Sequence, residues 1–95
     1  MAVGVIATFV AKQDAVNQVE EALRQAVALS RRDAGCEDYA LHRDQRNALC
    51  FYMLERWADA RALQQHQEQP HFKALITATE GKLDVLDVKV LDTLV

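Results

Sequence analysis

The sequence predicts an α+β fold of the ferredoxin-like class, in which a split β-α-β arrangement forms an antiparallel sheet with helices on one face. Four short stretches are apolar on one or both faces of a strand. Regions with helical spacing of apolar residues follow the first and the third of them, which gives the order β-α-β-β-α-β. At 95 residues the chain is too short for two independent cores, so residues 1–95 are expected to form one domain.

Composition excludes several classes of protein. The chain is 51% hydrophobic and 26% charged, which indicates a globular domain rather than a disordered one. A net charge of -3 with scattered basic residues gives no sign of a nucleic-acid partner. No apolar run approaches the length of a membrane span. The apolar N-terminus has neither a basic segment before it nor a small-residue cleavage site after it, so we expect a cytoplasmic protein that begins with a strand.

The first strand is predicted over Val3 to Val10, where both faces are largely apolar and should therefore be covered. An amphipathic helix is predicted from about Asp14 to Arg32, because apolar residues recur there at i, i+3, i+4 and i+7. Asp14 is expected to cap its start, and Gly35, which tolerates a positive φ, is expected to stop it.

A hairpin is predicted next. Its strands run from Cys36 to Arg43 and from Ala48 to Trp57, and a polar turn of about four residues joins them. One face of the second hairpin strand combines large apolar residues with a carboxylate, and it carries Leu49, Phe51, Met53, Glu55 and Trp57.

Two short helices and a strand complete the chain. Asp59 is expected to cap a helix that runs to about Glu68, and Pro70 should end it, because the residue before a proline avoids the helical region. A second helix follows over 72–79 and is closed by Gly81. In the last strand, over 83–90, the apolar positions change parity after Val85, which indicates a bulge or a strand covered on both faces.

The expected assembly of the protein follows from strands that are apolar on both faces. One helical layer covers only one face of a four-stranded sheet, yet the first and third strands are apolar on both faces. The simplest solution is a second copy packed on the uncovered face, so we expect a homodimer of facing sheets.

The candidate functional residues lie between 51 and 72. His66 shares a helix face with Leu63 and should point inward, either as a base or hydrogen-bond donor in a cavity or as a buried neutral histidine held by a backbone carbonyl. His71, at the start of the next helix, either joins this site or caps its own turn. Glu55 lies among large apolar neighbours, where a carboxylate needs a partner, so it is either catalytic or bonded to a helix end or to an arginine of the partner subunit, such as its Arg56 or Arg61.

Aromatic residues could form the walls of such a pocket. Trp57 is either core or a platform for a ligand. Further candidates for lining the pocket are Tyr39, Tyr52, His42 and Phe72. The histidines are not at the i, i+4 spacing of a zinc helix, and no third ligand stands at metal spacing, so no metal site is expected. The chain has three glycines and no glycine-rich phosphate motif, so no flavin or nicotinamide is expected either.

Several local motifs resemble those of the antibiotic biosynthesis monooxygenase (ABM) domains, which are small dimeric α+β barrels and include quinol-monooxygenase-like members. The resemblance covers nearly the whole chain. It is carried by Ala34-Gly35-Cys36 before the second strand, by Tyr39-Ala40-Leu41-His42-Arg43-Asp44, by Phe51-Tyr52-Met53-Leu54-Glu55-Arg56-Trp57, and by Ala62-Leu63-Gln64-Gln65-His66 with Pro70-His71-Phe72.

The resemblance implies several functions. Some members oxidise phenols or quinols with dioxygen and without metal or flavin, some degrade haem, and one branch isomerises a phosphorylated signalling sugar. The first strand lacks the asparagine of the haem-degrading branch, and His66 and Ile76 stand near where its tryptophan and histidine would be. The expected function is therefore a cofactor-independent monooxygenase for a small aromatic substrate and dioxygen, with His66 as the base. The alternatives are a sugar-phosphate isomerase, with Arg43, Arg56 or Lys73 as phosphate donors, and a dimer that binds a small ligand without catalysis.

Overall fold

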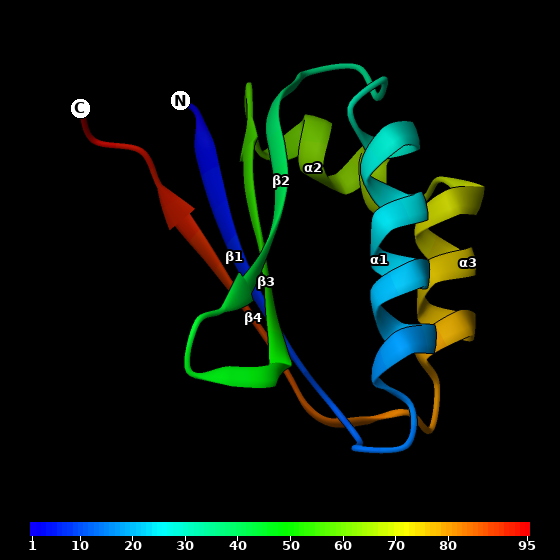
Figure 1. The fold of residues 1–95 in the computed structure, drawn as a ribbon. Coiled ribbons are helices and arrows are strands. Elements are labelled where there is room, and N and C mark those ends of the chain that lie inside the picture. The colour runs from blue at the N-terminus through cyan, green and yellow to red at the C-terminus, as the bar shows by residue number, and fades with distance from the viewer.

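The computed structural model describes residues 1–95 and shows a four-stranded antiparallel sheet with helices on one side (Figure 1). The strand order is β2-β3-β1-β4. The elements are β1 (Val3–Ala11), α1 (Val16–Ser30), β2 (Cys36–Asp44), β3 (Asn47–Trp57), α2 (Ala60–Gln67), α3 (Pro70–Thr79) and β4 (Leu83–Asp92). This arrangement confirms the ferredoxin-like α+β class, while the dimer stays a prediction.

The core lies between the sheet and the helices. Alternate residues of β1, from Val3 to Phe9, are buried on the helix side. They pair with buried residues of β3, since Ala7 lies opposite Met53 and Phe9 lies opposite Phe51. Helices α1 and α3 lie side by side over this face, and α2 sits near one end of it (Figure 1). No helix of the chain is long and apolar enough to cross a membrane.

Both ends of α1 differ from the prediction. Ala15, whose own amide bonds to the Lys12 carbonyl, occupies the N-cap position, and no side chain caps the helix, so the role proposed for Asp14 is wrong. The helix ends at Ser30, before Gly35. Gly35 has a φ of 81° in the loop that leads into β2, and a Cβ built on it would lie 2.5 Å from the Cβ of Ala62. Glycine is therefore needed there for its backbone conformation and for the close approach of α2.

The hairpin turn is tighter than predicted. β2 ends at Asp44 and β3 begins at Asn47, which leaves two residues in the turn instead of about four. The Asp44 carboxylate accepts a hydrogen bond from the amide of Arg46 at 2.8 Å and fixes this turn. A register shift in β2 between Cys36 and Asp38, which the sequence did not indicate, precedes Tyr39.

The helices that follow agree with the prediction. Asp59 accepts a hydrogen bond from the amide of Ala62 at 2.8 Å and caps α2. Pro70 occupies the first turn of α3, where a backbone N–H would have no partner within the helix, so its absence costs no hydrogen bond. Gly81, with a φ of 74°, closes α3.

β4 is an edge strand with its apolar side chains exposed. The register shift lies where Val10 and Ala11 of β1 pair with Val85 and Leu83, so the bulge comes before Val85 and not after it. Val88 is 52% exposed and Val90 57% exposed, although they face the same side of the sheet as the buried Ala7 and Val5. The expectation of a strand covered on both faces is therefore wrong for a single chain.

Candidate functional site

An apolar pocket of about 80 Å³ lies between the sheet and helices α2 and α3. Eleven of its 14 lining residues are hydrophobic, and they include residues of β1, α3 and β4. Side-chain polar atoms come from four lining residues, which are Tyr39, Glu55, His66 and Gln67. No arginine or lysine lines the pocket. Such a cavity suits an uncharged, mostly apolar ligand that offers a few polar groups.

His66 projects from α2 into this pocket and is only 2% exposed. Its Nδ1 lies 2.7 Å from Oδ2 of Asp33, so the partner is a carboxylate and not the backbone carbonyl that the sequence suggested. Burial lowers the pKa of His66, and the neighbouring Asp33 carboxylate opposes that effect. Neither ring nitrogen is among the fully buried polar atoms that lack a partner. Since Asp33 engages Nδ1, Nε2 is the nitrogen that remains open to a ligand.

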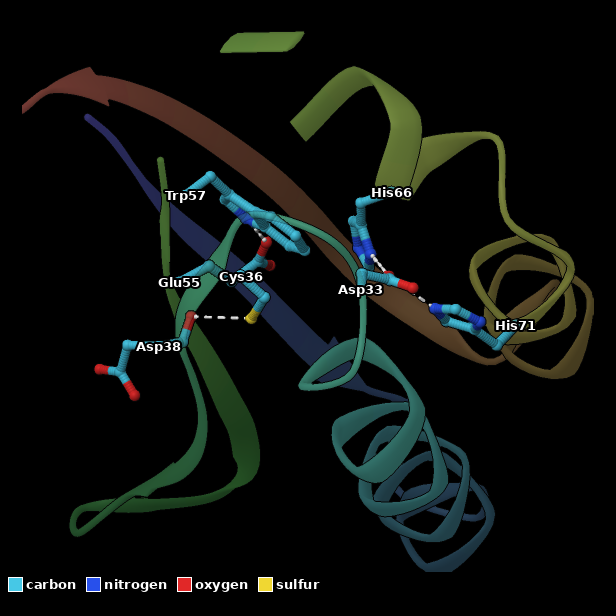
Figure 2. A network of polar contacts seen from close by, with 7 residues as sticks. All are labelled: Asp33, Cys36, Asp38, Glu55, Trp57, His66 and His71. Atoms are coloured by element: carbon cyan, nitrogen blue, oxygen red, sulfur yellow. Dashed lines mark hydrogen bonds and ion pairs between the residues drawn. The ribbon is translucent and has the colours of Figure 1, made fainter. Parts of the chain in front are cut away.

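Asp33 is the functional residue that sequence reasoning missed. It lies in the loop between α1 and β2, and its Oδ2 also lies 2.8 Å from Nε2 of His71, on α3 (Figure 2). Asp33 is 33 and 38 residues from the two histidines in the sequence, so no local pattern connects it to them. The available signal was an acidic residue two positions before the positive-φ glycine at 35.

His71 is in the network but does not line the pocket. Its ring lies beside a shallow depression between α1 and α3, which is a different cavity from the one that His66 faces. It contacts the site through Asp33 and through the His66 ring, whose centroid is 5.8 Å away. His71 therefore joins the site through Asp33 and not through the cavity wall, and its catalytic role stays a prediction.

Glu55 and Trp57 form a second polar pair, on β3 (Figure 2). The Trp57 indole Nε1–H donates to Oε1 of Glu55 at 3.0 Å. Burial raises the pKa of Glu55 to about 7, and the indole bond partly offsets the rise. Within one chain no arginine bonds to Glu55, and Arg56 pairs with Glu37 at the surface; a bond to an arginine of the partner subunit stays a prediction. Glu55 lines the same pocket as His66 and is poised between its neutral and charged forms near neutral pH.

Trp57 packs against a residue of the pocket wall without lining the pocket itself. It is fully buried and does not line the cavity. Its ring lies against the His66 ring with 4.6 Å between centroids. Tyr39 and Phe72 do line the pocket, as expected, and their ring centroids lie 5.6 Å and 5.3 Å from that of His66. Three aromatic rings thus pack around the imidazole.

Two expected lining residues lie elsewhere. Tyr52 alternates with the buried Phe51 and Met53, so it faces away from the helices, and its hydroxyl donates to Oδ2 of Asp44 at 2.8 Å. His42 pairs with Tyr52 across the hairpin and is exposed. It borders a separate cleft of about 270 Å³ between α1 and β2 that contains three arginines, among them Arg43. Neither residue lines the apolar pocket, contrary to expectation.

The cluster of Asp33, His66 and His71 has the donor types of a metal site, since its three ligand atoms lie within 4.8 Å of one another. Both nitrogen–oxygen distances, 2.7 and 2.8 Å, are those of charge-assisted hydrogen bonds. The second ring nitrogens have no carboxylate or carbonyl partner of the kind that orients metal-bound histidines. The side chains therefore satisfy one another as they stand, and the expectation of no metal stays a prediction.

Fold and site together define a class: a small α+β domain with an apolar pocket that contains a buried histidine–aspartate pair and a buried carboxylate. The family model for antibiotic biosynthesis monooxygenases matches residues 2–78. The chain belongs to this family, which confirms the resemblance inferred from its motifs.

Several solved structures have the same fold as this chain over almost its whole length. PA3566 from Pseudomonas aeruginosa is 36% identical, with a TM-score of 0.93, and the match covers 99% of this chain and 95% of that one. Rv0793 from Mycobacterium tuberculosis is 26% identical, with a TM-score of 0.94 and coverage of 99% and 96%. A structure of an antibiotic biosynthesis monooxygenase is 28% identical, with a TM-score of 0.90 and coverage of 97% and 98%. No curated protein matches the chain.

Proposed function

We propose that this protein is a cofactor-independent monooxygenase that oxidises a small phenol or quinol with dioxygen. One observation carries the proposal: His66 and Glu55 line the same apolar pocket, and Trp57 contacts both side chains. Family membership supports an oxygenase reaction. The pocket supports the class of substrate, because its walls are apolar and its polar groups are few.

In the proposed mechanism His66 is the general base. Its Nε2 takes the proton of a substrate hydroxyl, and the resulting anion is electron-rich enough to pass an electron to dioxygen directly. Recombination of the two radicals and loss of water complete the reaction, so a quinol and dioxygen give a hydroxyquinone and water. Glu55, with a pKa of about 7, can donate a hydrogen bond to a substrate oxygen in its neutral form. The apolar walls exclude bulk water from the anion.

The pocket disfavours the sugar-phosphate isomerase. Binding a phosphate in this cavity would require several cationic or amide donors. Gln67 is the only amide side chain in the lining, and the three cationic side chains considered for that role, Arg43, Arg56 and Lys73, do not line it. Arg43 instead pairs with Glu20 at the cleft between α1 and β2. A dimer that binds a ligand without catalysis remains the second candidate, and oxygen consumption distinguishes it from a monooxygenase.

The test is oxygen uptake with menadiol, measured against the enzyme-free rate. Wild-type protein should accelerate uptake. His66→Ala should lower the accelerated rate by about a hundredfold or more, the usual scale for losing general acid–base catalysis. His66→Gln keeps a hydrogen-bond donor but accepts no proton at neutral pH, so it should fold normally and stay slow. His42→Gln is the matched control, since it removes an exposed histidine that does not line the pocket.

Three results would contradict the proposal. Wild-type protein that leaves the menadiol and polyphenol oxidation rates unchanged would favour the ligand-binding dimer. Full activity in His66→Gln would make His66 a hydrogen-bonded wall of the pocket. Unfolding of both His66 variants would make it a structural core residue.

A further inference from the structure

Oδ2 of Asp33 is a shared acceptor for two imidazoles. His66 Nδ1 and His71 Nε2 lie 2.7 Å and 2.8 Å from this one oxygen, and all three side chains are largely buried, at 2%, 14% and 11% exposure for His66, His71 and Asp33. An ionised carboxylate only accepts hydrogen bonds, so each of these nitrogens carries a proton. The arrangement ties together the loop after α1, helix α2 and helix α3 (Figure 2).

We propose that Asp33 is a positioning residue for the base, that it holds His66 in the tautomer with its lone pair on Nε2, and that His71 weakens this support by bonding the same oxygen. The inference deepens the proposed function and rests on it for its role in catalysis. The tautomer of His66 and the opposed effects of Asp33 and His71 on its pKa can be measured without any substrate.

The tautomer follows from the geometry. A neutral imidazole has one protonated and one free nitrogen, and the bond to Asp33 assigns the proton of His66 to Nδ1. Nε2 is then the acceptor toward the pocket, which a base requires. The rings of Trp57, Tyr39 and Phe72 prevent the imidazole from turning over. A carboxylate behind a catalytic histidine serves the same purpose in hydrolases.

The opposed effects follow from charge. When His66 accepts a proton it becomes a cation, and the adjacent Asp33 carboxylate stabilises it. His71 draws on the same oxygen and repels that cation when it is itself protonated, and it lowers the pKa of His66. The other titratable groups that face His66 are Tyr39 from β2 and Glu55 from β3, which line the same pocket. Burial raises the pKa of Tyr39, so this phenol stays neutral at physiological pH.

The experiment is a pH titration of the three histidines by two-dimensional ¹H–¹⁵N NMR on uniformly labelled protein without substrate. His66→Gln and His42→Gln assign the signals. Wild-type His66 should show the Nδ1–H tautomer at high pH. Asp33→Asn should lower the pKa of His66 by about one unit, because it removes the charge. His71→Phe should raise it by about half a unit, because the competing donor and cation are gone. His71→Gln, which keeps a neutral donor, should fall between wild type and His71→Phe.

The same variants give a kinetic test with menadiol. The acid limb of the pH–rate profile should move to lower pH in Asp33→Asn and to higher pH in His71→Phe. A merely structural role would instead lower the rate equally at every pH. An Nε2–H tautomer in wild-type His66, or shifts of the same sign in both variants, would overturn the proposal. Should Asp33→Asn not fold, the wild-type tautomer and the His71→Phe titration decide. The expected tautomer and shifts without oxygen uptake would refute the proposed function and leave the positioning role intact.

Discussion

Trp57 donates its indole N–H to the carboxylate of Glu55, two residues away on the same face of β3, at 3.0 Å. A charged carboxylate in an apolar environment is costly, and this bond is the only side-chain bond that Glu55 makes. Burial raises the pKa of Glu55, and the bond from Trp57 limits that rise. Through this bond Trp57, which is fully buried and does not line the pocket, influences the charge of a carboxyl group that does.

Glu55 should make stability fall as pH rises. Its pKa is raised from 4.5 to about 7, so between these values the folded protein holds a proton that the unfolded chain has released. This contribution is fully present below about pH 4.5 and is lost as pH rises to about 7. Glu55→Gln removes the titration. The difference in free energy of unfolding between Glu55→Gln and wild type should therefore shift in favour of the variant by about 1–3 kcal/mol between pH 5 and pH 8.

Urea unfolding at the two pH values checks this expectation. Glu80→Gln, on an exposed carboxylate at the end of α3, is the control and should show no such gain. An equal difference between Glu55→Gln and wild type at both pH values would mean that Glu55 titrates normally in the folded protein.

Trp57→Phe should raise the pKa of Glu55 further. Phenylalanine keeps an aromatic ring against His66 but has no N–H, and the indole bond is what lowers the Glu55 pKa against the effect of burial. Carboxyl ¹³C NMR of Glu55 during a pH titration measures the shift, which should be upward by about half a unit or more. The smaller ring should also cost about 1–3 kcal/mol of stability, because it leaves a cavity in a fully buried position. A Glu55 pKa that is unchanged or lower would mean that the indole N–H does not stabilise the charged carboxylate.

Much of the fold could be predicted because the local signals agree with the final structure. Runs of apolar residues on both strand faces marked β1 and β3, Asp59 marked the start of α2, and Pro70 marked the break before α3. The start of α1 was mispredicted, because an N-cap such as Asp14 is only one way to begin a helix and the buried Ala15 takes that position instead. Local pattern identifies an element more reliably than its ends.

The site was predictable where it lies on regular elements and not where it depends on a loop. Glu55 and His66 were found because a strand face and a helix face point them inward. Asp33 reaches them only through tertiary structure. Tyr52 and His42 were misplaced because an aromatic or imidazole side chain on a strand does not reveal which face the helices cover.

Gly35→Ala should destabilise the fold strongly. The φ of 81° disfavours any Cβ, and the added atom would lie 2.5 Å from the Cβ of Ala62 on α2. We expect a loss of about 2–4 kcal/mol from backbone strain and overpacking together. Gly81→Ala is the matched control, because its φ of 74° is similar but nothing lies within 4 Å, so it should lose only about 1–2 kcal/mol. Thermal or urea unfolding compares the two, and equal losses would show that the close approach of α2 relaxes without cost.

The last prediction is the homodimer. Apolar side chains of β4 are exposed on both faces of this edge strand, with Val85 and Leu91 on the face away from the helices and Leu86, Val88 and Val90 on the other. An exposed apolar edge strand is rarely left uncovered in water, and a second copy is the simplest cover. Light scattering should therefore report about twice 10.7 kDa at micromolar concentration. Val85→Lys should shift the protein toward monomer, because it places a charge on the sheet face that the second copy is expected to cover, whereas Lys73→Glu, on the exposed side of α3, should leave the mass unchanged. A monodisperse monomer in the wild type would mean that β4 is covered by something other than a second copy of this chain.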